Sequence, residues 1–166
     1  MLKVSFINKE VKQFNGGKVT IVTLRGEINL DSLNYLPNPI RIWMLRYIDS
    51  NEGFSVEKHG FLPVINVTGK AICSEEDTVD KAFGERLAEA RAKKKLYGLM
   101  INLSKQLFKY YFKILYGFTG IDNYKENNLD CLESTIDKYE GLWERENVHA
   151  KTLINDQFNR QSTTKS

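Results

Sequence analysis

The spacing of apolar residues changes near residue 73, from alternation to a repeat of three and four. Before that point, short runs in which apolar and polar side chains alternate are separated by glycine and proline, which is typical of β-strands. After it, apolar residues recur on one side of successive helical turns. This order predicts an α+β fold: an N-terminal antiparallel sheet of three to five strands packed on a long central helix, with a C-terminal helix alongside. We expect one domain over residues 1–149, with the sheet in residues 1–73, helices in residues 77–147, and a flexible polar tail at residues 150–166.

The first two strands are predicted to form a hairpin. Leu2, Val4 and Phe6 alternate with polar residues, and a second run rich in β-branched residues follows at residues 18–28. Between them lies the sequence Asn-Gly-Gly at residues 15–17, a turn signal because glycine adopts positive φ without steric cost.

Residues 31–53 are ambiguous. Pro37 and Pro39 flank Asn38, which is expected to forbid regular helix there and to favour an extended or turning path. The apolar residues at positions 40–47 then fit either a short strand or one to two helical turns, and their alternation with Arg41 favours the strand. Two further short strands are predicted at residues 54–58 and 64–73, separated by Gly60 and Pro63.

The helical half begins with polar and acidic residues at positions 74–78, which can cap a helix. Residues 99–118 are then apolar nearly all round, apart from lysines at positions 105, 109 and 113, so this segment must be covered. It is predicted to be the central core helix or the interface of a homodimer formed through residues 99–118. The last helix has an apolar stripe that suits antiparallel packing on another helix: Leu129, Leu132, Ile136, Tyr139 and Trp143.

Composition restricts the class of protein. The chain has 166 residues, 42% of them hydrophobic, which is a globular composition. It lacks an apolar run long enough to span a membrane, and residues 1–14 lack the layout of a secretion signal. Two cysteines are too few for a disulfide framework. We therefore expect a cytoplasmic protein without a membrane partner.

Charge is distributed unevenly along the chain. Residues 74–118 carry 9 basic and 6 acidic side chains, whereas residues 119–149 carry 3 basic and 8 acidic side chains. Either the acidic helix packs against the basic one, or the basic end of the central helix binds a polyanion such as DNA or RNA. In the second case the binding residues would be Arg86, Arg91, Lys93, Lys94 and Lys95.

No group of residues indicates an enzyme, so no catalytic, cofactor or metal residue is predicted. His59 and His149 lie far apart in polar stretches, and Cys73 and Cys131 are interpreted as structural. The acidic residues Glu75, Glu76, Asp77 and Asp80 are interpreted as helix-capping and solvated side chains. The aromatic residues at positions 110–118 fit a core better than a base-stacking surface.

One segment resembles a known group of proteins. Residues 69–95 are similar to a strand–turn–helix stretch of small uncharacterised bacteriophage accessory proteins through Gly69, Ala71, Cys73, Asp77, Asp80, Gly84, Ala88, Arg91 and Ala92. The resemblance implies a phage or prophage origin and a sheet packed on a long helix. The order of late strands followed by a helix is also similar to double-stranded-RNA-binding folds, although the helix start is acidic here where those domains have lysines.

These observations predict a non-enzymatic phage-type accessory protein that binds a host protein or complex, with inhibition of a host defence system as one such role. The alternative is a nucleic-acid-binding module that uses the basic end of the central helix. A third hypothesis is a binder of small anionic ligands, such as nucleotides.

Overall fold

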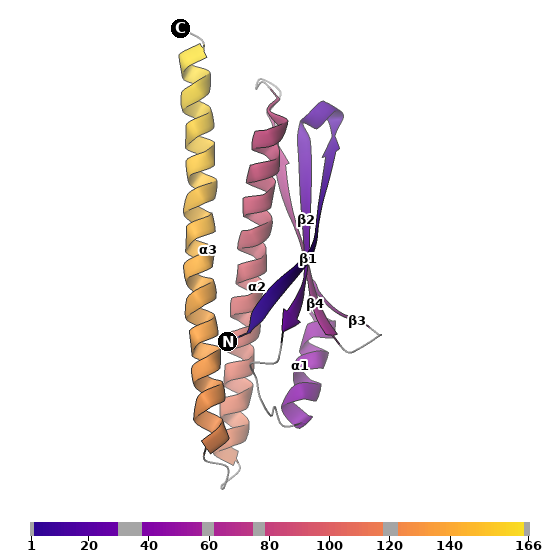
Figure 1. Cartoon of the computed structure of the whole chain (residues 1–166), viewed down its shortest axis with the longest axis vertical. Helices are drawn as coiled ribbons and strands as arrows, with labels where there is room; N and C mark the ends of the chain where they lie inside the picture. Colours follow the sequence, from indigo (N-terminus) through magenta and orange to yellow (C-terminus); the bar gives the residue numbers. More distant parts are fainter. Residues whose placement is uncertain (1, 30–37, 58–61, 75–78, 118–122, 165–166) are drawn as a thin grey trace.

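The computed structural model describes residues 2–29, 38–57, 62–74, 79–117 and 123–164 (Figure 1). Four strands form one sheet in the order β1-β2-β4-β3, in which every neighbouring pair is antiparallel. The predicted α+β class is confirmed. The elements are β1 (Lys3–Phe14), β2 (Val19–Asn29), α1 (Asn38–Ser50), β3 (Phe54–Glu57), β4 (Leu62–Ile72), α2 (Lys81–Gly117) and α3 (Asn123–Thr164), with a short 3-10 turn η1 (Asn15–Gly17) between β1 and β2.

The predicted N-terminal hairpin is present. β1 and β2 are joined by η1, where Asn15, Gly16 and Gly17 all have positive φ values of 53°, 68° and 102°. This is the conformation that glycine adopts readily, which explains the Asn-Gly-Gly sequence. The pairing is regular from Asn8 to Phe14, and a β-bulge shifts the register between Phe6 and Asn8.

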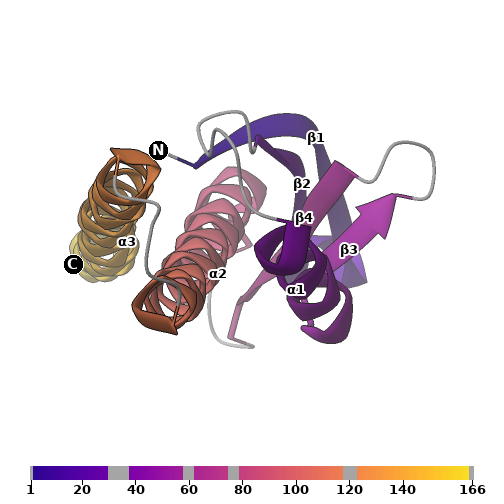
Figure 2. The ribbon, with the colours of Figure 1, turned by 90° about the horizontal axis from the view of Figure 1, so that it is seen from below.

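α2 covers one face of the sheet, and α3 lies on the far side of α2 (Figure 2). Alternate residues of β2 are buried on the covered face, among them Val22, Leu24 and Ile28. They pack with apolar residues of α2, and the core reaches α3 through Leu132 and Tyr139. The helix-on-sheet arrangement therefore matches the prediction from periodicity.

α3 runs antiparallel to α2, as its apolar stripe predicted (Figure 1). Two buried hydrogen bonds connect it to the rest of the fold. The N–H of Leu2 donates to Thr135 Oγ1 at 2.8 Å, and Asn128 Nδ2 donates to the Tyr111 hydroxyl at 3.0 Å.

The segment around residues 40–47 is a helix, so the preference for a strand there was wrong. Ile40, Met44 and Ile48, four residues apart, are all fully buried on one side of α1. Pro39 is the second residue of α1, in the first turn, where a missing N–H costs no intrahelical hydrogen bond. This repeat of four outweighs the short alternation that favoured a strand.

Two helix limits also differ from the prediction. α2 begins at Lys81 and is capped by Asp80, whose Oδ1 accepts a hydrogen bond from the N–H of Phe83 at 2.9 Å. Residues 75–78, which the sequence placed at this helix start, lie outside the described residues. α3 continues to Thr164, so the segment predicted to be a flexible tail from residue 150 is helical up to that residue.

Candidate functional site

Among the described residues, those considered for catalysis are not brought together by the fold. His149 is exposed on α3, with Nδ1 3.3 Å from Glu146 Oε2. Cys73, directly after β4, and Cys131 of α3 are half-buried and are not joined in a disulfide. His59 and the acidic residues 75–77 lie outside the described residues. Within the described ranges, no three potential metal ligands form a group.

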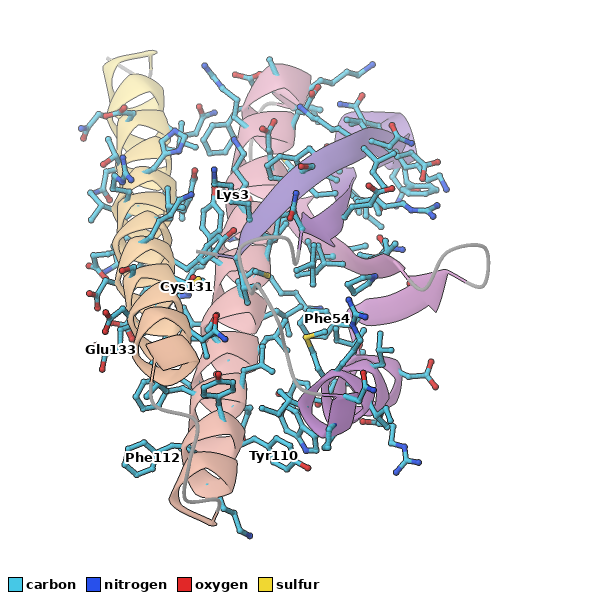
Figure 3. All side chains as sticks on the ribbon, turned by 60° about the horizontal axis from the view of Figure 1, so that its bottom comes forward. Lys3, Phe54, Tyr110, Phe112, Cys131 and Glu133 are labelled. Atoms are coloured by element: carbon cyan, nitrogen blue, oxygen red, sulfur yellow. The ribbon has the colours of Figure 1, made fainter. Side chains whose placement is uncertain are left out.

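The aromatic residues of α2 divide between core and surface. Tyr111 is buried, and Tyr110 extends toward α1, where its ring stacks on Trp43 with centroids 4.5 Å apart (Figure 3). Phe112 extends from another side of the helix and is exposed. Met100, Leu103 and Leu107 are buried within the chain's own core. A dimer through residues 99–118 stays a prediction, and Phe112 is the exposed large apolar side chain among the described residues of that segment.

The five cationic residues predicted to bind a polyanion do not share one surface. Arg91, Lys94 and Lys95 line a shallow hollow between α2 and α3, which we call the basic hollow. Its other lining residues are Gly98, Leu99, Asn102 and Trp143, and none of the residues described along its wall is acidic. Arg91 Nη1 donates to the carbonyl oxygen of Lys70 at 2.6 Å, and Lys94 Nζ lies 4.5 Å from the centroid of the Trp143 ring. Arg86 is exposed and is not part of the hollow.

Lys93 belongs to a different cluster, beside β1. Its Nζ is 2.8 Å from Glu89, which also accepts a hydrogen bond from Lys9 of β1. Burial alone would raise the pKa of the Glu89 carboxyl, but the hydrogen bonds from Lys9 and Lys93 outweigh it and hold that pKa below its ordinary value. Lys93 is thus neutralised within the chain, whereas Lys94 and Lys95 are not paired with a carboxylate in the described structure.

The sheet face opposite α2 carries exposed side chains, and we call it the open face. In an antiparallel sheet, directly opposed residues point to the same side, so the register places Phe14, Val19 and Ile72 in one row across three strands. The side chains of Phe14 and Ile72 are 47% and 64% exposed. Such an apolar row on a surface is typical of an interaction site.

Basic residues lie next to this apolar row. The adjacent row consists of Lys12, Ile21 and Lys70, and both lysines are exposed. Lys12 Nζ is 2.9 Å from Glu10 Oε1, two residues along the same strand. Lys12 is thus paired within its strand, and Lys70 is the cation that the open face adds to its exposed apolar side chains.

The outer edge of β1 is a third accessible feature. β1 is the first strand in the sheet order and pairs only with β2 among the described strands. All of its residues except Val4 are exposed, including the apolar side chains of Phe6, Ile7 and Val11. Figure 2 shows β1 as the outermost strand on its side of the sheet.

Sequence analysis did not identify the open face or the edge of β1. The adjacent apolar pair Phe6 and Ile7, which breaks the alternation, was the available signal. Gly69, Ala88 and Ala92, three of the residues from which a resemblance to phage proteins was inferred, meet where β4 packs on α2. A Cβ atom on Gly69 would lie 2.0 Å from the carbonyl oxygen of Ala88 and 2.5 Å from the nitrogen of Ala92.

Comparisons of the chain with protein-family models, curated proteins and solved structures found no significant match. No helix of the described residues is long and apolar enough to cross a bilayer.

Proposed function

We propose that the chain is a non-enzymatic binding protein that holds a partner protein on its open face. The observation that carries this proposal is the apolar row Phe14, Val19 and Ile72. The side chain of Phe14 is 47% exposed to solvent and that of Ile72 is 64% exposed. Burying an exposed isoleucine in an interface contributes on the order of 1.5–3 kcal/mol, so the row can supply the centre of a contact.

The charges beside the row specify the partner's chemistry. Lys70 lies beside Ile21 in the next row, while Lys12 is paired with Glu10, so a complementary surface presents an apolar side chain next to a carboxylate. The resemblance of residues 69–95 to small bacteriophage proteins makes a protein of the bacterial host the first partner to test.

The test compares two variants that each remove one exposed apolar side chain. Ile72→Ser acts on the open face, and Val148→Ser acts on α3, where the side chain is 54% exposed. Proteins captured from bacterial lysate by the wild-type chain are identified, purified and titrated against all three chains. We expect Ile72→Ser to weaken binding at least tenfold and Val148→Ser to leave it unchanged. Equal affinities for wild type and Ile72→Ser, or turnover of the captured molecule, would refute the proposal.

The basic hollow supports a second candidate function, the binding of nucleic acid. It combines three cations with the Trp143 ring, and none of the residues described around it is acidic. Cations of the hollow that contact phosphate groups would release the counterions bound to the nucleic acid. Binding should therefore weaken steeply as the salt concentration increases. Measured by fluorescence anisotropy on single-stranded DNA and RNA, Lys95→Ala should lower both the affinity and the slope against salt.

Lys93→Ala is the matched control for this second function. Lys93 is one of three successive lysines, yet it is paired with Glu89 on the β1 side. Its replacement should therefore change nucleic-acid binding less than Lys95→Ala does. Equal losses in the two variants would mean that the hollow is not the binding site, and salt-insensitive binding would exclude the phosphate contacts.

A further inference from the structure

The edge of β1 offers a backbone pairing surface beside the open face. An edge strand presents backbone N–H and C=O groups that lack strand partners, and such an edge can accept another strand. Lysines on an edge usually discourage this pairing. Here Lys9 is drawn onto α2, where its Nζ is 2.9 Å from Glu85 Oε1 and also contacts Glu89, so its charge is already compensated.

The regular part of β1 is centred on Val11. The bulge interrupts the ladder between Phe6 and Asn8, and η1 begins at Asn15, so residues 8–14 are the stretch free of irregularities. Val11 is the middle residue of this stretch. A second copy of the strand, running antiparallel about a two-fold axis at Val11, would pair with residues 8–14 over their whole length.

Charge favours the same centre. A two-fold axis perpendicular to a continuous sheet pairs residues of the same face, so Glu10 can oppose only even-numbered positions between residues 8 and 14. A centre at Glu10 would oppose two glutamates, and a centre at Lys12 would oppose two lysines. The centre at Val11 places Glu10 opposite Lys12 of the second copy, and it does so twice because the contact is symmetric.

We propose that two copies of the chain associate through β1 in this register and form one continuous eight-stranded sheet. The two β1 strands exchange backbone hydrogen bonds, Val11 packs against Val11 of the second copy on the α2 side, and the Glu10–Lys12 pairs lie on the open side. Both open faces then lie on the same side of the sheet. This contact differs from self-association through residues 99–118, because it uses neither α2 nor α3.

A charge-reversal series tests the register. Glu10→Lys, Lys12→Glu and the double exchange Glu10→Lys/Lys12→Glu are compared with wild type by sedimentation equilibrium. These side chains are 50% and 59% exposed, so the fold tolerates the changes, which circular dichroism checks. Each single reversal opposes like charges at two places and should raise the dimer dissociation constant about tenfold or more. The double exchange restores opposite charges and should restore the wild-type dissociation constant.

Lys151→Glu, an exposed reversal on α3, controls for the change in net charge and should leave the dimer intact. Phe112→Ser distinguishes the alternative interface, because it would weaken a dimer through residues 99–118 and leave the β1 contact unchanged. A wild-type chain that stays monomeric at every concentration would overturn the proposal. A dimer that the single reversals do not weaken, or that the double exchange does not restore, would overturn it as well.

Discussion

Gly69 allows the backbone of β4 to lie directly against the backbone of α2. Ala88 and Ala92, one helical turn apart on α2, face it, and a Cβ atom at position 69 would lie 2.0 Å from the Ala88 oxygen. Backbone atoms cannot move aside as the end of a flexible side chain can. The helix and the sheet would have to separate locally, with loss of the surrounding contacts.

Gly69→Ala should therefore lower the free energy of unfolding by about 3 kcal/mol or more. Gly141→Ala is the matched control, because Gly141 lies inside α3 with nothing within 4 Å of its added Cβ atom. That substitution should stabilise the protein by about 0.5–1 kcal/mol, since alanine favours helix. Denaturant titrations of both variants measure the difference, and a mild effect at position 69 would contradict the close approach of the two backbones.

Glu89 makes stability depend on pH in the acidic range. Its folded-state pKa is lowered from 4.5, although burial opposes the hydrogen bonds from Lys9 and Lys93 that cause the lowering. A lowered pKa stabilises the fold above the unfolded-state pKa, and this contribution is lost as pH falls through the folded-state value.

We expect Glu89→Gln to be less stable than wild type near pH 7, by less than about 1 kcal/mol because the cluster is partly in water. The difference should shrink as pH falls below 4.5. Thermal unfolding of both proteins between pH 3 and 7 tests this. A difference that stays constant over the whole range would show that the charge of Glu89 is not involved.

At the scale of elements, Thr135 attaches Leu2, directly before β1, to the first third of α3. Its Oγ1 accepts the N–H of Leu2 at 2.8 Å and donates to the carbonyl oxygen of Cys131 at 2.7 Å, and Leu2 is fully buried. The N–H of Leu2 has no access to water at this position, so loss of its acceptor leaves a buried donor unsatisfied.

Thr135→Val, which preserves shape and removes the hydroxyl, should destabilise the protein by about 1–3 kcal/mol. Thr135→Ser retains the oxygen and should cost less. In hydrogen exchange, the amides at the start of β1 should lose protection in the valine variant, while those of β4 should change only with global stability. Equal stability of the valine and serine variants would argue against a stabilising hydrogen bond between Leu2 and Thr135.

The elements differ in how far the sequence predicted them. The hairpin and the two long helices have strong local signals, in the glycines of η1 and in apolar spacing sustained over many turns. α1 was missed because the repeat of Ile40, Met44 and Ile48 competes with a shorter alternation, and Pro39 is unfavourable only inside a helix. The exposed edge of β1 depends on strand order, which is set by long-range pairing and not by local pattern.

The surroundings of the three successive lysines could not be predicted from the local sequence either. Lys93, Lys94 and Lys95 are equivalent as a run of sequence, yet successive helical positions point about 100° apart. Their separation between Glu89 and the basic hollow therefore follows from where β1 and α3 pack around α2. The sequence shows that the three lysines are positively charged. Only the packing of neighbouring elements shows which of them is paired with a carboxylate.

For the whole molecule, the proposed pairing of β1 strands predicts stability that depends on concentration. Association favours the folded state by mass action, so the melting temperature of the wild type should rise as protein concentration increases. The melting temperature of Glu10→Lys should be nearly independent of concentration over the same range. Scanning calorimetry at several concentrations measures both, and a wild-type melting temperature that does not change would contradict association through this edge.

The two edges of the sheet are unequal, and this limits assembly. At the edge opposite β1 lies β3, only four residues long, and the guanidinium of Arg91 already occupies the carbonyl oxygen of Lys70 on β4. A two-fold contact that uses β1 of both copies consumes that edge in each chain and leaves no free β1 edge for a third chain. Association would therefore stop at two chains, so the protein can expose the edge of β1 without polymerising into a fibre.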